Sequence, residues 1–211
     1  MPQGSAQFNI HRGLLVELSE EMRRLVYEDI EDIEEGMEET EKSPVLVDMG
    51  TSEETMAYFS EFCYTGDYSV DSEMWDHCRL KPDTTDQAAG DMEDQEKALA
   101  HARLYVFARR YNVKAAQELA LSNLGEFIGR NTDRTSVIPC LVEYALENTP
   151  EAPTTTDKLL EFLAKCTAWV IRSRGPTWKQ FHRLLASIDR KDFFAVFCKY
   201  IGQKAHTTRP W

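Results

Sequence analysis

Apolar residues recur at helical spacing along most of this chain. The first such stretch covers residues 11–18, and a longer one begins at Ser19. Ser19 predicts the start of a helix, because a serine hydroxyl readily accepts a hydrogen bond from a first-turn N–H group. Acidic residues fill the remaining positions of this predicted helix. Its expected apolar face consists of Met22, Leu25, Val26, Ile30, Ile33 and Met37.

Three short stretches have the apolar pattern of strands instead. They are residues 8–10, residues 45–47 and residues 67–70, and the second opens just after Pro44, which ends the acidic helix. Between the last two, Thr51-x-x-Glu54 resembles a capping box and predicts another helix. The expected inner face of that helix carries Met56, Phe59, Phe62 and Cys63.

The second half of the chain is expected to be helical throughout. Residues 71–97 are polar and acidic and contain Pro82 and Gly90, which predicts an inserted, mobile loop. A helix is expected from about Ala98 to Tyr111, and further helices up to about residue 205. No internal repeat is present, which argues against a solenoid.

The net charge of −12 is spread unevenly. Residues 1–97 hold 26 acidic and 7 basic side chains, whereas residues 98–211 hold 10 acidic and 17 basic ones. The acidic part would repel a phosphate backbone, and the basic residues of the other part are scattered, so nucleic acid is not an expected ligand. Apolar runs are too short for a membrane span, and the N-terminal residues do not resemble a secretory signal.

Catalytic and metal-binding patterns find little support in the sequence. The five cysteines are widely spaced and lack a CxxC pair, so they are expected to be reduced thiols of an intracellular protein, cytoplasmic or nuclear. The spacing of Cys63, His77, Cys78 and His101 fits no common zinc site. No phosphate-binding loop or nucleophile elbow occurs. We therefore expect no catalytic residue, no metal, no cofactor and no small-molecule substrate.

Four segments together resemble the BTB/POZ family, in the form found in fungi. FCYTGDYSV spans residues 62–70 and HARLYVFARRYNV spans residues 101–113, and these are similar to the centre of that domain. Residues 8–15, with the pattern Phe-x-Ile-His-Arg-x-Leu-Leu, look like its second strand and first helix. VEYALENTP, residues 142–150, is similar to the fungal branch.

This resemblance implies an α+β fold that is mainly helical with a small sheet, followed by an all-α C-terminal extension. The BTB/POZ-like domain would cover residues 8–128, with residues 71–97 as an acidic flexible insertion, and the helical extension would cover residues 129–205. The first strand of the family's hairpin is nearly absent, since only seven residues precede Phe8.

The function implied by the resemblance is non-enzymatic protein–protein interaction, as a scaffold or adaptor that self-associates or recruits other proteins. One alternative is a substrate adaptor that binds a cullin scaffold of a ubiquitin ligase; another is a thiol- or metal-dependent enzyme. The candidate partner interface lies on the acidic helix. The favoured alternative is that its apolar residues pack on their own domain and that the acidic side chains only keep the helix soluble. It consists of Met22, Leu25, Val26, Ile33, Glu35 and Met37.

Overall fold

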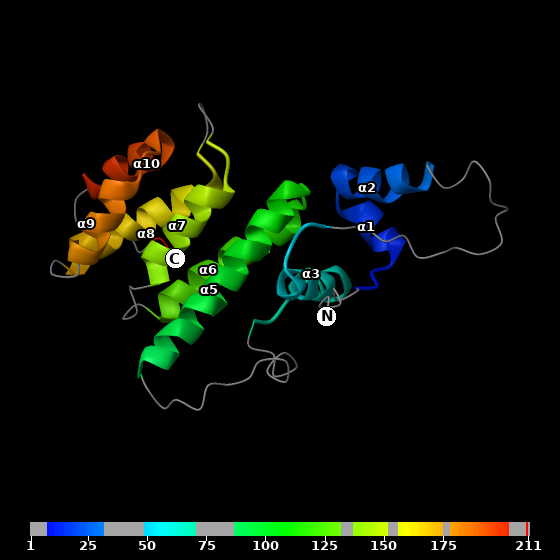
Figure 1. Ribbon diagram of the computed structural model, residues 1–211, viewed down its shortest axis with the longest axis horizontal. Helices are drawn as coiled ribbons and strands as arrows, with labels where there is room; N and C mark the ends of the chain where they lie inside the picture. Colours follow the sequence, from blue (N-terminus) through cyan, green and yellow to red (C-terminus); the bar gives the residue numbers. More distant parts are fainter. Residues whose placement is uncertain are drawn as a thin grey trace, which may run out of the picture. The chain divides into compact units, whose positions relative to one another are not determined.

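The computed structural model describes residues 8–31, 49–70, 87–131, 137–151, 156–174, 178–202 and 210. Within these ranges every regular element is an α-helix (Figure 1). The helices are α1 (Arg12–Leu18), α2 (Glu20–Glu31), α3 (Glu53–Thr65), α5 (Gln87–Arg110), α6 (Lys114–Arg130), α7 (Val137–Asn148), α8 (Lys158–Arg174), α9 (Trp178–Ser187) and α10 (Lys191–Ile201).

The expected α+β fold with a small sheet is therefore wrong for the part of the chain that the structure describes. Residues 67–70 show the physical reason. The backbone N–H of Asp67 donates to the Thr65 hydroxyl at 3.1 Å, and that of Tyr68 donates to the Asp67 carboxylate at 2.8 Å. The next N–H, of Ser69, donates to the carboxylate of Glu61 at 3.2 Å. These local side chains occupy the donors that a strand ladder would need.

The other two predicted strands have different outcomes. Residues 8–10 are irregular, and the Asn9 carbonyl accepts a hydrogen bond from the Tyr64 hydroxyl. Residues 45–47 lie outside the described ranges. The insertion expected at residues 71–97 is helical from Gln87 onward, where α5 begins.

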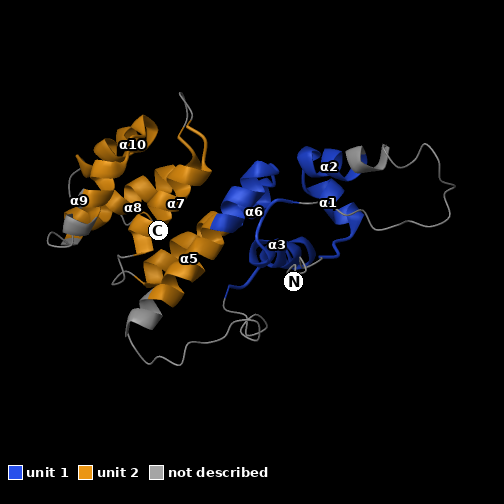
Figure 2. Cartoon of the chain, viewed as in Figure 1, with its two compact units in different colours: residues 1–70, 103–119 blue, residues 71–102, 120–211 orange. Residues whose placement is uncertain are grey.

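The chain divides into two compact units (Figure 2). Unit 1 comprises Met1–Val70 and Arg103–Leu119, and unit 2 comprises Asp71–Ala102 and Ala120–Trp211. The unit boundary passes through α5 and again through α6, so each of these helices contributes residues to both units. The expected division into a domain of residues 8–128 and a helical extension of residues 129–205 stays a prediction.

Ser19 joins two helices of unit 1. Its hydroxyl accepts a hydrogen bond from the backbone N–H of Met22 at 3.0 Å, which confirms the predicted N-terminal cap of α2. The same hydroxyl donates to the carbonyl of Tyr111 at 2.6 Å, just after the end of α5. The Ser19 side chain thus provides a hydrogen-bond acceptor for the first turn of α2 and also holds the backbone just after α5.

The helix expected from the Thr51-x-x-Glu54 pattern begins one residue later than that pattern implies. The cap of α3 is Ser52, whose hydroxyl accepts a hydrogen bond from the N–H of Thr55 at 3.2 Å. The core of unit 1 then forms around Phe59, which is fully buried on α3. Its ring meets that of Phe107 on α5 edge-on, with centroids 4.8 Å apart, a favourable arrangement for aromatic pairs.

Helix α3 ends at Gly66, which adopts a left-handed conformation with φ of 74° and donates its N–H to the carbonyl of Phe62. A side chain at this position would meet no atom within 4 Å, so the backbone angle alone requires glycine. We expect Gly66→Ala to lower the free energy of unfolding by about 1 kcal/mol. Urea denaturation followed by circular dichroism measures this difference.

Gly13, in the first turn of α1, is the matched control. An added Cβ meets nothing within 4 Å there either, but the backbone is helical. Gly13→Ala should therefore stabilise the protein by about 0.5–1 kcal/mol. Equal effects of the two substitutions would contradict the conformational explanation.

Unit 2 is built around α8, which contacts α7, α9 and α10. Asp157 caps this helix, because its carboxylate accepts a hydrogen bond from the N–H of Leu159 at 2.9 Å. The side chains that fill the core are fully buried or nearly so. They are Leu141, Val142, Leu159, Leu160, Leu163, Cys166, Val170, Phe181, Leu184 and Phe193.

Arg190, in the turn before α10, ties that helix to the end of α7. Its guanidinium donates to the carbonyls of Leu146, Thr149 and Pro150 at 3.2, 2.9 and 3.2 Å. It also binds both oxygens of the Asp192 carboxylate, at 3.0 and 2.7 Å. The two charged side chains are only 13% and 7% exposed. Bidentate, charge-assisted bonds in such a sheltered place are among the stronger polar contacts of a protein.

The hydrogen bonds from Arg190 lower the pKa of Asp192 below its ordinary value, and burial of the carboxylate opposes this only in part. A carboxylate with a lowered pKa stabilises the folded state above its ordinary pKa, and this stabilisation is lost as the pH falls through the folded-state pKa. We expect wild type to be more stable than Asp192→Asn at pH 7. The difference should shrink below pH of about 4. Urea midpoints of both proteins measured from pH 7 to pH 2 test this, and a constant difference would contradict it.

Candidate protein-interaction surface

The residues of the expected interface on α2 differ in how far they are buried. Met22 is fully buried and Val26 is 3% exposed, so both belong to the core of unit 1. Leu25 is half-buried. The remaining three, Ile33, Glu35 and Met37, lie outside the described residues. A partner could reach Met22 and Val26 only if unit 1 opened, so they are poor contact residues.

Exposed aromatic side chains gather elsewhere on unit 1. Among the residues whose side chains the structure describes, three large apolar side chains are exposed: Tyr27 at 46%, Tyr64 at 50% and Met92 at 69%. The two tyrosines lie on α2 and α3 of unit 1, whereas Met92 belongs to unit 2. Tyrosine is enriched in protein interfaces because its ring offers a large rigid contact and its hydroxyl a polar one.

Tyr64 holds the segment before α1. Its hydroxyl accepts a hydrogen bond from the N–H of His11 at 3.1 Å and donates to the carbonyl of Asn9 at 3.3 Å. The imidazole of His11 stands edge-on to the phenol ring, with centroids 5.7 Å apart. The irregular residues before α1 are thus fixed on the exposed end of α3.

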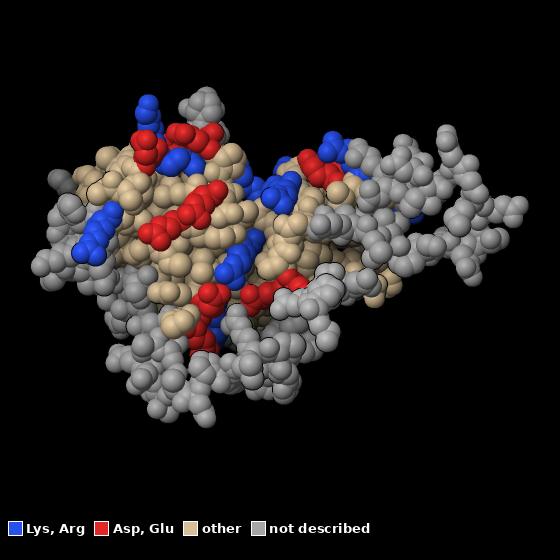
Figure 3. Space-filling view, in the orientation of Figure 1, with Lys and Arg blue, Asp and Glu red and all other residues tan. Residues whose placement is uncertain are grey.

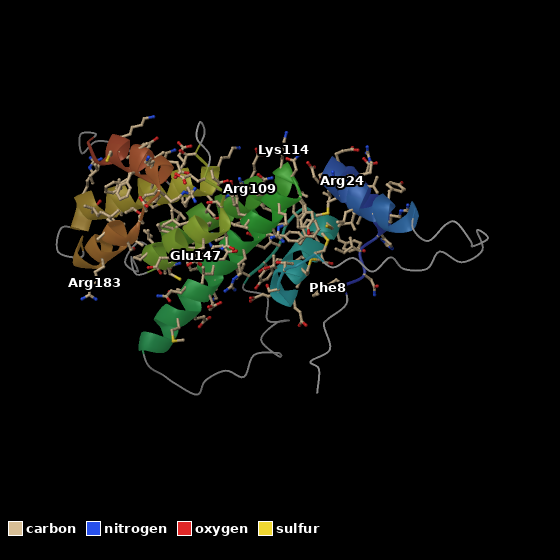
Figure 4. The ribbon with its side chains drawn as sticks, turned by 45° about the horizontal axis from the view of Figure 1, so that its top comes forward. Phe8, Arg24, Arg109, Lys114, Glu147 and Arg183 are labelled. Atoms are coloured by element: carbon tan, nitrogen blue, oxygen red, sulfur yellow. The ribbon has the colours of Figure 1, made fainter. Side chains whose placement is uncertain are left out.

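Arg12 continues this arrangement toward α2. Its guanidinium carbon lies 4.4 Å from the centroid of the Tyr27 ring, within the range of a cation–π contact. Figure 4 shows this part of unit 1, with Phe8 labelled ahead of it in the chain and Arg24 labelled on α2. We call the connected set the aromatic–cationic surface. It comprises Asn9, His11, Arg12, Tyr27 and Tyr64.

Sequence reasoning did not single out this surface. Tyr27 directly follows the buried Val26, so it falls outside the apolar stripe of α2, and Tyr64 likewise falls outside the buried positions of α3. An aromatic residue on the solvent side of an amphipathic helix was the available signal. The proximity of Tyr64 to His11 is a tertiary contact between residues 53 positions apart, and helical periodicity carries no information on it.

The thiols of the core are unsuited to nucleophilic chemistry. Burial raises the pKa of Cys63 to about 12, and burial also raises the pKa of Cys166. A reactive cysteine needs the thiolate form near neutral pH, which these surroundings disfavour. Within the described residues, Cys63, Cys140, Cys166 and Cys198 form no disulfide bond.

The described residues contain no group of three or more histidine, cysteine or acidic side chains that could hold a metal ion. Of the four residues weighed as a zinc set, His77 and Cys78 lie outside the described ranges. His101 is 8% exposed on α5, where its ring lies 6.2 Å from that of Phe127.

Charge is mixed on the face shown in Figure 3, where basic and acidic side chains alternate over the described part of the chain. Nucleic-acid interfaces instead gather basic side chains into a patch or stripe. In the same described residues, none of the helices has the length and apolar character needed to cross a bilayer.

Comparison with known proteins adds no family. Neither the models of protein families, nor the curated proteins, nor the solved structures contain a match to this chain. The BTB/POZ resemblance stays a prediction.

Proposed function

We propose that this chain is a protein–protein interaction module, of scaffold or adaptor type, that carries no catalytic activity of its own. The observation that supports this most is the aromatic–cationic surface, where Tyr27 is about half exposed beside Arg12 and Tyr64 is about half exposed beside His11. Tyrosine and arginine are the residue types that most often dominate the energy of protein binding.

Two further observations support the proposal. The BTB/POZ resemblance implies protein binding, and the segments that carry it include α3 and α5, whose rings pack together in unit 1. The raised pKa values of Cys63 and Cys166 count against the alternative of a thiol enzyme. The cysteines of the described residues form no disulfide bond, which also supports a cytoplasmic or nuclear location, where cysteines stay reduced.

The cullin-adaptor alternative gains no support from the described residues. Its expected contacts include Met22, which is fully buried. We therefore place the first partner contact on the aromatic–cationic surface and not on the apolar face of α2.

The test is quantitative affinity capture from the protein's own cells with wild type, Tyr27→Ala and Met92→Ala. Tyr27 and Met92 are both exposed, but only Tyr27 lies on the proposed surface. We expect a set of proteins held by wild type and by Met92→Ala whose retention falls at least about tenfold with Tyr27→Ala. Circular dichroism checks that both variants are folded. A captured set that is the same for all three proteins would refute the proposed surface.

A further inference from the structure

Among the described residues, Arg12 differs in its contacts from the arginines that form ion pairs. Arg23 pairs with Glu20 at 2.9 Å, Arg103 with Glu54 at 3.4 Å and Arg190 with Asp192 at 2.7 Å. Within the described residues, the guanidinium of Arg12 instead contacts the ring of Tyr27 and has no carboxylate within ion-pair distance. Its charge and its N–H donors are therefore available to a group from outside.

The surroundings of Arg12 also favour the binding of an acidic group. The aromatic–cationic surface contains no acidic side chain, and His11 precedes Arg12 directly. Gly13 follows it, is exposed, and leaves open space where a side chain would stand. A guanidinium held on an aromatic ring binds a carboxylate through two parallel hydrogen bonds at little cost in side-chain entropy.

We propose that the aromatic–cationic surface binds an acidic segment of a partner protein, and this inference rests on the proposed function above. A glutamate or aspartate of that segment would pair with Arg12. Its apolar neighbours would pack on the exposed rings of Tyr27 and Tyr64. The net charge of −12 repels acidic polymers at long range, so this recognition depends on local contacts and not on general attraction.

The substitutions for the test form two matched pairs. Arg12→Gln removes the proposed contact, and Arg183→Gln removes an equal charge from α9 of unit 2, where Figure 4 shows Arg183 pointing away from the helices. Gly13→Glu places an acid beside Arg12, whereas Gly13→Gln adds nearly the same volume without charge. Neither substitution at Gly13 meets a neighbouring atom within 4 Å of its Cβ.

The experiment is a selection from a random peptide library displayed on phage, followed by affinity measurements with the enriched peptides. Wild type should enrich peptides with an excess of aspartate and glutamate. Arg12→Gln and Gly13→Glu should bind these peptides about tenfold more weakly, as expected for loss of one charge-assisted pair. Arg183→Gln and Gly13→Gln should bind them as wild type does.

Three results would overturn the inference. Enriched peptides without an acidic excess, or acidic peptides that Gly13→Glu binds as tightly as Gly13→Gln does, would show that the partner is not acidic. The same holds if no peptide is enriched. The proposed function is judged separately, because affinity capture with Tyr27→Ala uses whole proteins and does not depend on the charge of the partner.

Discussion

Arg190→Ala is expected to lower the free energy of unfolding of unit 2 by about 3–5 kcal/mol, the cost of leaving one partner of a sheltered ion pair alone. The substitution leaves the Asp192 carboxylate, which is only 7% exposed, without its cation. It also removes the donor to the carbonyls of Leu146, Thr149 and Pro150. Hydrogen exchange should then increase in α7 and α10.

Arg190→Lys separates the contribution of the positive charge from that of the guanidinium hydrogen bonds. Lysine keeps the positive charge but cannot reach three carbonyls and two carboxylate oxygens at once. We expect Arg190→Lys to recover less than half of the free energy of unfolding that Arg190→Ala loses. Arg183→Ala, at an exposed position of the same unit, should change the free energy of unfolding by at most about 0.5 kcal/mol. Similar stabilities of the two alanine variants would contradict the role assigned to Arg190.

Phe59→Ala should destabilise unit 1 to a similar extent, by about 3–5 kcal/mol. Phe59 is fully buried. The centroid of its ring lies 4.8 Å from that of Phe107, which it meets edge-on, and 6.3 Å from that of Phe62, on which it stacks. The loss combines the transfer of an aromatic ring to water with the cavity left between α3 and α5. Urea denaturation gives the change in free energy, and hydrogen exchange in α3 and in residues 103–110 assigns it to unit 1.

Phe59→Leu keeps this prediction measurable if the alanine variant does not fold. A leucine fills part of the space, so we expect a smaller loss, about 1–2 kcal/mol. Met92→Ala is the control, because that side chain is 69% exposed and its removal should have little effect. A leucine variant as stable as wild type would show that the ring of Phe59 does not hold the two helices together.

The helices could be predicted from the sequence where a local pattern, such as a capping residue or an apolar periodicity, marks them. The hydroxyl of Ser19 caps α2, and the apolar positions of that helix, such as Met22 and Val26, are buried as periodicity indicates. Residues 67–70 were misread because their pattern suits a strand, whereas the carboxylates of Glu61 and Asp67 take up the backbone donors. Short apolar stretches do not reveal such competition.

The candidate surface depended on information that local patterns lack. Periodicity places Tyr27 and Tyr64 outside the buried stripes of their helices but does not show that His11 and Arg12 lie between them. That arrangement requires α1 to pack on both α2 and α3. The resemblance instead predicted an interface on the apolar face of α2, where Met22 and Val26 belong to the core.

The path of α5 through both units limits how this protein can be dissected. Residues 87–102 of the helix belong to unit 2 and residues 103–110 to unit 1, and α6 is shared in the same way. No single cleavage of the backbone releases either unit as an intact, continuous fragment. A chain truncated after α6 would keep all of unit 1, but it would also keep the parts of α5 and α6 that belong to unit 2. Such a shortened chain would therefore not report on the function of unit 1 alone.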